Sequence, residues 1–350
     1  MTAKRVRVMI VDDSAFSRQT LKKMLEADSG ISVVAVATDG IDAMAKTMRY
    51  TPDIITLDFE MPEMDGFSFL RWLMKERPTP VIMVSSYGDS ATVFKALELG
   101  AVDFIAKPTR RASVELKDIA DDLLKKVRSI ERNSLSKLRD NLGKLSERRV
   151  APGVIPEEQV SNEMVVVGSS TGGPAAIQLI LTRVSAVFPS ILISQHMPKG
   201  FTRSLAERLN RISALTVKEA EDNEMIVPST AYICPGGMHM EIEKRGSTHS
   251  IGLRSPAESD RYVPSIDVMM KSAAETFGPK TVGVLLTGMG NDGRKGMLDI
   301  KQRGGYTIAE SEETAVVFGM PNEAIRAGAA DCIQPLYEIP NELVRILKKG

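Results

Sequence analysis

Short apolar runs alternate with helix-forming segments along most of this 350-residue chain. A short apolar run followed by a segment with apolar residues at helical spacing is typical of a βα unit. Repeated βα units predict a parallel sheet covered by helices on both faces, because parallel strands need crossover connections. In the first series we expect strands at 6–11, 33–37, 54–57, 81–84 and 104–106, and helices at 14–25, 40–48, 65–75 and 91–99.

The length suggests two domains, since single domains usually have about 100–200 residues. We expect an α/β domain over 1–121, a charged helical linker over 122–162 and a second domain over 163–350. The second is expected to be a doubly wound parallel sheet with a small antiparallel hairpin. Its predicted strands are at 165–167, 191–194, 231–234, 240–243, 250–254, 282–286, 306–309 and 332–334, and its helices at 175–181, 200–210, 265–276, 293–303, 321–327 and 340–348.

The linker is rich in charged residues and serine, with Leu or Val at roughly helical spacing. Ala151-Pro152-Gly153 and Pro156 interrupt this pattern. A solvated spacer is the simpler interpretation, and a helix that binds a partner is the alternative.

Composition excludes several classes of protein. The 45 basic and 45 acidic residues balance, so no nucleic-acid partner is expected. No apolar run approaches the ~20 residues of a membrane span, and the first residues do not resemble a signal peptide. Cys234 and Cys332 lack the spacing of a metal site or disulfide framework. We therefore expect a cytoplasmic protein without direct membrane insertion.

Polar residues occur where the predicted strands of the first domain end. Asp12 and Asp13 follow the first strand, and the third, fourth and fifth strands are followed by Asp58, Ser85 and Lys107. Strand carboxyl ends gather around the ligand crevice of an open α/β sheet. Carboxylates gathered there repel one another unless a cation lies among them, and Mg²⁺ favours oxygen ligands. The pattern predicts a Mg²⁺ site that can add a phosphate oxygen as a further ligand. The lysine would contact the same phosphate.

A glycine turn joins a predicted strand to a predicted helix in the second domain. The turn, Gly168-Ser169-Ser170-Thr171-Gly172, matches the G-x-S-x-G pattern of a nucleophile elbow. The helix N-terminus offers unpaired N–H groups to a developing oxyanion. The alternative is an ordinary Gly/Ser loop without catalytic function.

A serine nucleophile needs a base and a carboxylate that orients the base. His196 follows the apolar run 191–193, and adjacent strand ends would bring it to Ser170. His239 is the alternative base, and His249 lies near the hairpin tip expected at 244–247. The best candidate carboxylate is Asp292, at a helix start where the ionised form is favoured. The competing acids are Asp222, Asp260, Asp267 and Asp299.

The order Ser, His, Asp differs from that of α/β-hydrolases, so the elbow does not imply that fold. Residues 288–293 also spell G-x-G-x-x-G, with Glu310 at the end of the next strand. This is the dinucleotide-binding fingerprint, although Asp292 would meet the pyrophosphate with like charge. The residues alone thus leave open a non-enzymatic regulator that binds a nucleotide. A transcription factor is disfavoured, since no helix-turn-helix pattern or basic face is present.

The first domain resembles the response-regulator receiver family. The matching motifs are V-D-D-S at 11–14, L-D-F-E-M-P-E-M-D-G at 57–66, V-S-S at 84–86 and D-F-I-A-K-P at 103–108. The resemblance implies a flavodoxin-like (βα)5 fold and phosphorylation of Asp58 by a chemotaxis histidine kinase. It implies Mg²⁺ ligation by Asp12, Asp13, Asp58 and the backbone carbonyl of Glu60. It also makes Ser85 the switch hydroxyl, Lys107 the phosphate partner and Phe104 the aromatic switch.

The second domain resembles the chemotaxis protein-glutamate methylesterase family, CheB. The matching motifs are G-S-S-T-G-G-P at 168–174, I-S-Q-H-M-P-K-G-F-T-R-S-L-A-E-R-L-N at 193–210, L-L-T-G-M-G-N-D-G at 285–293 and V-V-F-G-M-P-N-E-A-I at 316–325. The resemblance implies that Ser170 is the nucleophile, His196 the base and Asp292 the orienting acid. Backbone amides of Thr171 and Met289 would form the oxyanion hole, with no cofactor at the esterase site.

The family demethylates methylglutamate residues of chemoreceptors and deamidates certain receptor glutamines, so receptors are the expected substrates. Arg203 is a possible substrate contact by location alone. The unphosphorylated receiver is expected to cover the serine site, and phosphorylation to loosen that contact. The sequence departs from the family at 261–265, R-Y-V-P-S in place of the expected H-R-P-S, which leaves local substrate contacts open. No receptor-tethering tail is recognised.

Overall fold

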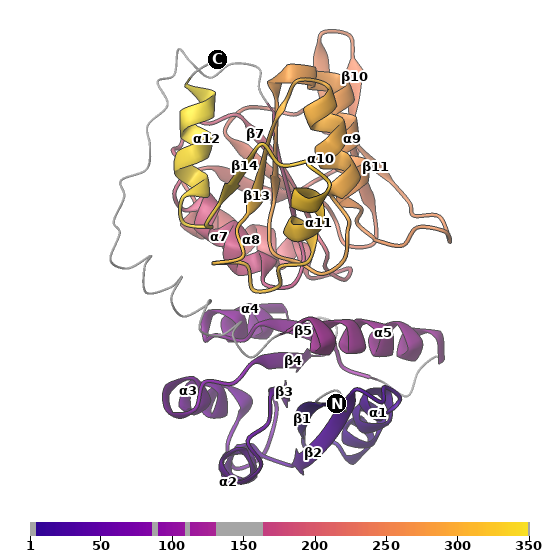
Figure 1. Cartoon of the computed structure of the whole chain (residues 1–350), viewed down its shortest axis with the longest axis vertical. Helices are drawn as coiled ribbons and strands as arrows, with labels where there is room; N and C mark the ends of the chain where they lie inside the picture. Colours follow the sequence, from indigo (N-terminus) through magenta and orange to yellow (C-terminus); the bar gives the residue numbers. More distant parts are fainter. Residues whose placement is uncertain (1–4, 86–89, 109–112, 131–163, 349–350) are drawn as a thin grey trace. The chain divides into compact units, whose positions relative to one another are not determined.

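The computed structural model describes residues 5–85, 90–108, 113–130 and 164–348. The chain divides into two compact units, residues 1–139 and 140–350 (Figure 1). None of the helices in the described ranges is long and apolar enough to cross a lipid bilayer.

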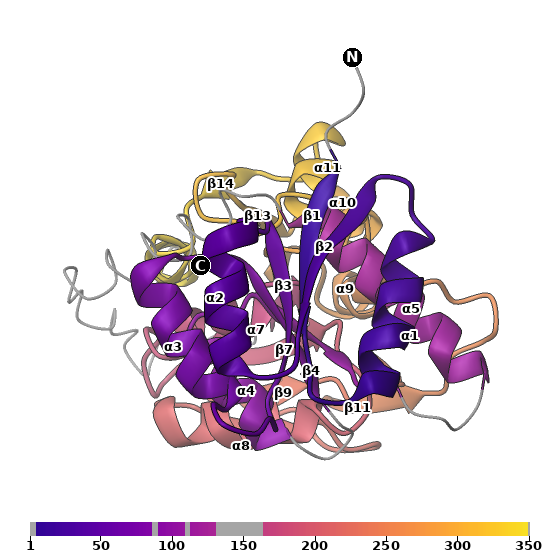
Figure 2. The same ribbon diagram turned by 90° about the horizontal axis from the view of Figure 1, so that it is seen from below.

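The first unit has a five-stranded parallel sheet in the order β2-β1-β3-β4-β5. This is the flavodoxin-like order, which confirms the predicted fold class. The strands are β1 (Val6–Val11), β2 (Ile31–Ala37), β3 (Ile54–Asp58), β4 (Val81–Ser85) and β5 (Asp103–Ala106). The helices are α1 (Ala15–Glu26), α2 (Gly40–Tyr50), α3 (Gly66–Glu76), α4 (Ser90–Glu98) and α5 (Ser113–Ser129). In Figure 2, α1 and α5 lie on one side of the sheet and α2, α3 and α4 on the other.

Side-chain caps define where three helices of this unit begin. Ser14, Asp39 and Asp65 each accept a hydrogen bond from the backbone N–H three residues later. Each cap satisfies a donor that the first helical turn otherwise leaves unpaired. At the other end of the unit, α5 continues past the boundary expected at residue 121 and ends at Ser129. Most of the expected linker, residues 131–162, lies outside the described residues.

The second unit contains a seven-stranded parallel sheet in the order β14-β13-β12-β6-β7-β9-β8. The strands are β6 (Met164–Ser169), β7 (Ser190–Gln195), β8 (Thr216–Glu219), β9 (Thr230–Ile233), β12 (Thr281–Leu285), β13 (Tyr306–Glu310) and β14 (Cys332–Gln334). The predicted antiparallel hairpin is present as β10 (His239–Arg245) and β11 (Thr248–Arg254). Strand β8 was not predicted, because it is a four-residue edge strand containing two charged residues.

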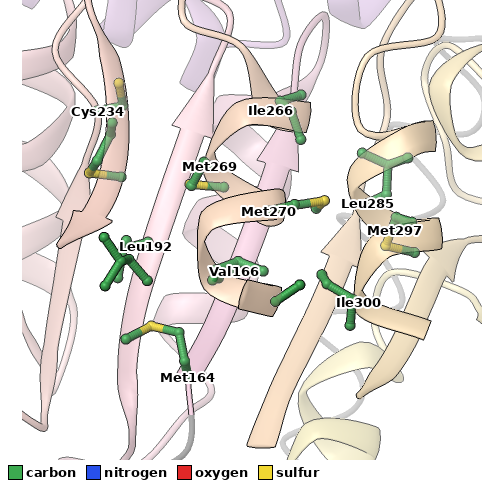
Figure 3. Packing of buried hydrophobic residues seen from close by; sticks show 14 of the residues in the cluster. Met164, Val166, Leu192, Cys234, Ile266, Met269, Met270, Leu285, Met297 and Ile300 are labelled. Atoms are coloured by element: carbon green, nitrogen blue, oxygen red, sulfur yellow. The ribbon is translucent and has the colours of Figure 1, made fainter. Parts of the chain in front are cut away.

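Helices cover both faces of this sheet (Figure 1). On one face lie α9 (Ile266–Phe277), α10 (Arg294–Gln302) and α11 (Met320–Arg326), and on the other α7 (Gly173–Leu181), α8 (Thr202–Ile212) and α12 (Ile339–Leu347), with a short 3-10 turn η2 (Gly278–Lys280) after α9. Figure 3 shows Met269 and Met270 of α9 above Val166 and Leu192 of the sheet, all of them fully buried. Each such side chain contributes about 1.5–3 kcal/mol by leaving water, so α9 is firmly anchored.

Candidate active site

Three strand ends meet at the centre of the second sheet. Strand β6 pairs with β7 on one side and with β12 on the other. The sheet grows in opposite directions from this point, which makes it the topological switch point where open α/β sheets bind ligands. The backbone N–H of His196 after β7 donates to Ser169 O (3.0 Å), and the N–H of Ser170 donates to Thr287 O after β12 (3.0 Å). These bonds hold the three strand ends together.

His196 and Asp292 form a hydrogen-bonded pair at this position. His196 Nε2 lies 2.8 Å from Asp292 Oδ2. The Asp292 side chain is 1% exposed and that of His196 is 15% exposed, so the imidazole is the member of the pair that a substrate can reach. The structure thus brings together a histidine and an acid from different strand ends, both selected from the sequence.

The start of α9 binds the Asp292 carboxylate. The N–H of Ile266 donates to Oδ2 (2.8 Å) and the N–H of Asp267 to Oδ1 (3.0 Å). Ser265 Oγ also donates to Oδ1 (3.2 Å). Burial favours the neutral acid, but the hydrogen bonds from His196 and from the backbone amides outweigh it and lower the pKa of Asp292 below its usual value. The ionised carboxylate is therefore the stable form beside His196.

The two serines of the glycine turn have different environments. The Ser169 hydroxyl is buried and donates to Gln195 Oε1 (2.6 Å). Gln195 Nε2 in turn donates to the carbonyls of Ser170 and His196, each at 3.0 Å. Ser170 is partly exposed, and a Cβ placed on Gly288 would lie 2.7 Å from its Cβ. Ser170 is thus the serine whose side chain is accessible, and the glycine at 288 leaves the space it needs.

Thr171 and Met289 lie on the two loops that meet at Ser170. Within the described ranges, neither backbone N–H donates a hydrogen bond, whereas that of Ser170 donates to Thr287 O. Thr171 is buried and its carbonyl accepts from Thr287 Oγ (2.9 Å). Two unpaired donors near a partly exposed hydroxyl are the type of group that stabilises an oxyanion.

His239, the alternative base, is fully engaged elsewhere. Its Nε2 lies 2.9 Å from Asp260 Oδ2, and its Nδ1 accepts from the N–H of Ser265 (3.0 Å). Its side chain is buried, so neither nitrogen is available to a serine. His249 belongs to β11, where its ring lies 4.6 Å from that of Phe277. Of the three histidines, His196 is therefore the one suited to act as the base.

The dinucleotide interpretation does not agree with the position of Glu310. Its side chain is fully buried, with Oε2 accepting from the N–H of Thr287 (2.7 Å) and Oε1 from Thr314 Oγ (2.9 Å). A ribose needs an accessible carboxylate at this position. Asp292 adds a negative charge at the loop where a pyrophosphate must bind.

The first unit holds a separate group of acidic residues. Carboxylate oxygens of Asp12, Asp13 and Asp58 all lie within 4.8 Å of one another. Lys107 Nζ lies 2.5 Å from Asp58 Oδ2 and 3.7 Å from Asp12 Oδ1. Burial raises the pKa of Asp58 to about 6 and also raises that of Asp12. Carboxylates that are costly to ionise together fit a divalent cation with oxygen ligands.

The other predicted residues of this unit lie around the same strand ends. Ser85 Oγ is buried and has no hydrogen-bond partner in the described residues, so it can bind a further group. Phe104 is buried, with Lys126 Nζ 5.4 Å from its ring centre. Glu60 is exposed, two residues after Asp58.

Comparison with known families accounts for both units. The CheB methylesterase family model matches residues 165–343, and the response regulator receiver domain model matches residues 8–118. The chain belongs to the CheB protein-glutamate methylesterase family. A protein-glutamate methylesterase/protein-glutamine glutaminase of Geobacter sulfurreducens is 45% identical over 98% of this chain and 97% of its own. One from Thermotoga maritima is 41% identical, over 99% of this chain and 100% of its own.

The crystal structure of the Thermotoga maritima CheB methylesterase catalytic domain is similar to the second unit. It is 45% identical, covers 53% of this chain and 100% of its own, and has a TM-score of 0.52. The predicted family and the predicted fold of the CheB catalytic domain are therefore confirmed.

Two residues of this CheB site, Gln195 and Tyr262, were missed in the sequence, and His239 was named only as an alternative base. Gln195 and His239 hold backbone groups around the site, as described above. Tyr262 lies on His196, with ring centres 5.2 Å apart and planes 4° from parallel. Gln195 directly precedes His196 in the family motif, and this position could have indicated that Gln195 belongs to the site. Tyr262 belongs to the segment that departs from the family pattern, and no sequence rule indicates where its ring points.

Proposed function

We propose that this chain is a phosphorylation-regulated hydrolase that demethylates methylglutamate residues of chemoreceptors and deamidates specific receptor glutamines in chemotaxis adaptation. The pairing of His196 with the buried Asp292 beside Ser170 supports this function most directly. Relatives of nearly equal length carry the name protein-glutamate methylesterase/protein-glutamine glutaminase.

Ser170, His196 and Asp292 are the proposed catalytic triad. Because Nε2 of His196 faces Asp292, Nδ1 is the nitrogen that receives the Ser170 proton. Ser170 Oγ attacks the side-chain carbonyl carbon, and the resulting oxyanion binds the N–H groups of Thr171 and Met289. The imidazolium gives its proton to the leaving methoxide, or to the amide nitrogen in deamidation, so that methanol or ammonia departs.

Water completes the reaction by the same route in reverse. His196 takes a proton from the water as its oxygen attacks the acyl-enzyme, and then returns a proton to Ser170 Oγ as the ester bond breaks. The product is a glutamate side chain. Asp292 stays ionised throughout, because the amides of α9 hold its charge.

The receiver is proposed to control this reaction. Asp58 is the phosphate acceptor, with a chemotaxis histidine kinase as donor. Asp12, Asp13, Asp58 and the Glu60 carbonyl would hold Mg²⁺, which would supply positive charge to the phosphoryl group. Lys107 and Ser85 then bind phosphate oxygens, and the Phe104 ring responds to the position of Ser85. Phosphorylation is proposed to relieve inhibition of the serine site by the receiver, with the charged linker expected over 122–162 beginning only after α5 ends at Ser129.

The decisive experiment is release of labelled methanol from methylated receptor membranes, with and without a small-molecule phosphodonor. Ser170→Ala should lower the rate by several powers of ten, while Ser247→Ala at the exposed hairpin tip should not. Phosphodonor should accelerate the wild type and have no effect on Asp58→Asn. Undiminished turnover by folded Ser170→Ala would refute the triad. If removal of residues 1–121 leaves the rate unchanged or lowers it, the proposed inhibition is wrong.

A further inference from the structure

The ring of Tyr262 lies against the imidazole of His196, the proposed base. Its ring is nearly parallel to the imidazole of His196, with 4° between the planes. The single hydrogen bond from Nε2 to Asp292 fixes one atom of the imidazole but leaves the ring free to turn about that bond. A flat ring against its face removes this freedom. The direction of Nδ1, the atom that must reach Ser170, is then fixed as well.

Tyr262 is itself held by the loop that carries Asp292. Its hydroxyl donates to Asn291 Oδ1 (3.2 Å) and accepts from the N–H of Asn291 (3.4 Å). Gly290 leaves room for this contact, because a Cβ there would lie 2.4 Å from the tyrosine hydroxyl oxygen. The aromatic ring and the carboxylate, which contact different parts of His196, are thus supported by adjacent residues.

The segment from Asp260 to Ser265, which contains Tyr262, is held at both ends by one buried side chain. His239 Nε2 bonds Asp260 Oδ2 (2.9 Å), and His239 Nδ1 accepts from the N–H of Ser265 (3.0 Å). Asp260 Oδ2 also accepts from the N–H of Ala257 (2.9 Å). Anchors before and after Tyr262 limit the movement of its backbone, so the stack on His196 is built into the fold.

We propose that Tyr262 is a positioning residue that fixes the plane of the His196 imidazole and thereby aims Nδ1 at Ser170. The proposal rests on the hydrolase function proposed above. It assigns the stacking to the aromatic ring and gives the hydroxyl a secondary role as a tether. It also gives a role to the segment that departs from the family pattern, as a support for the base.

The kinetic test compares two kinds of substitution in the full chain, using methylated receptor membranes. Tyr262→Phe keeps the ring and should retain kcat within about three-fold. Tyr262→Leu and Tyr262→Met remove the ring and should lower kcat by about ten- to a hundred-fold with little change in KM, since small misplacements of a catalytic group have effects of this order. Tyr337→Leu is the matched control. Tyr337 follows the edge strand β14, and its hydroxyl donates to Glu313 and not to a residue of the proposed site.

The spectroscopic test does not depend on activity. The chain has three histidines, so NMR of histidine-labelled protein can be assigned by comparison with His196→Gln. The ring protons of His196 should show a ring-current shift in the wild type and Tyr262→Phe, and lose it in Tyr262→Leu and Tyr262→Met. Unchanged signals from His249, which lies in the hairpin, show that the variants remain folded.

Three results would overturn the proposal. These are absence of a ring-current shift in the wild type, wild-type kcat in a folded variant without the ring, and a loss in Tyr262→Phe as large as in Tyr262→Leu. If the non-aromatic variants do not fold, two results still decide it. One is the ring-current shift of His196 in the wild type, and the other is kcat of Tyr262→Phe, which must not fall to the level of the inactive reference Ser170→Ala. Absence of methanol release from the wild type would count against the hydrolase function and leave the NMR result intact.

Discussion

Nε2 of His196 lies 2.8 Å from Oδ2 of Asp292, although 96 positions separate the two residues in the chain. The contact exists because β6 is flanked by β7 and β12, so the loops after these strands converge. The start of α9 completes it by donating backbone N–H groups to both oxygens of the same carboxylate. Sheet order and helix placement thus combine to give His196 an ionised partner.

Replacement of that partner should disable the base. Asp292→Asn places an amide NH₂ among groups that are all donors, so the side chain can no longer accept every bond and hold His196 in the required tautomer. We expect kcat to fall by about 10⁴-fold, as for the comparable substitution in serine proteases. Methanol release measures this, with Asp299→Asn on α10 as the control. An Asp292→Asn enzyme within ten-fold of wild type would contradict the proposed role.

Loss of His239 should lower the free energy of unfolding. His239→Leu leaves the N–H of Ser265 without its acceptor and removes one of the donors to Asp260. A buried donor left unpaired costs about 1–3 kcal/mol, and we expect a loss of unfolding free energy in that range. Denaturant unfolding followed by circular dichroism measures it. The comparison is His249→Leu in the hairpin, and equal stability of His239→Leu and wild type would show that the anchor is unimportant.

A methyl group at position 288 should displace the nucleophile. In Gly288→Ala the new Cβ would lie 2.5 Å from Met320 Sδ and 2.7 Å from Ser170 Cβ, both closer than atoms can approach. The Met320 side chain can yield, whereas movement of Ser170 misaligns its hydroxyl, so we expect at least a ten-fold loss of kcat. Gly30→Ala in the receiver, whose nearest atom is 3.3 Å away, is the control. Full activity in folded Gly288→Ala would disprove the close approach.

The receiver should be destabilised by the charge on Asp58 when Mg²⁺ is removed. Burial raises the pKa of Asp58 to about 6, above the unfolded value of about 3.9. The folded state therefore binds the proton more tightly, and this contribution is complete below about pH 4 and lost as the pH rises through about 6. At pH 7.5 in EDTA, Asp58→Asn should be more stable than wild type by about 3 kcal/mol.

Trp72 of α3 is the single tryptophan of the chain, so its fluorescence reports unfolding of the receiver specifically. The difference between Asp58→Asn and wild type should shrink as the pH falls from 7 to 5, because the wild-type carboxyl becomes protonated. Saturating Mg²⁺ should stabilise the wild type more than the variant. A constant difference over this pH range would mean that Asp58 is not the group responsible.

Local sequence patterns were enough to place most of the elements and most of the chemically important residues. Ser170, His196 and Asp58 directly follow or end apolar runs, and parallel strands point their carboxyl ends to one edge. The edge strand β8 was missed because Thr216–Glu219 is short and carries charged side chains. The G-x-S-x-G spacing singled out Ser170, whereas the choice between His196 and His239 needed either the family motifs or the hydrogen bonds of the structure.

By itself, then, the sequence determined which residues lie at strand ends and that two α/β domains bear them, since periodicity and turn residues act over a few neighbouring positions. Only the tertiary structure decided that α9 binds Asp292, that Gln195 joins the Ser170 and His196 loops, and that the Tyr262 ring covers His196. These contacts depend on strand order and on side-chain direction in loops, and neither is set by the spacing of residues along the chain.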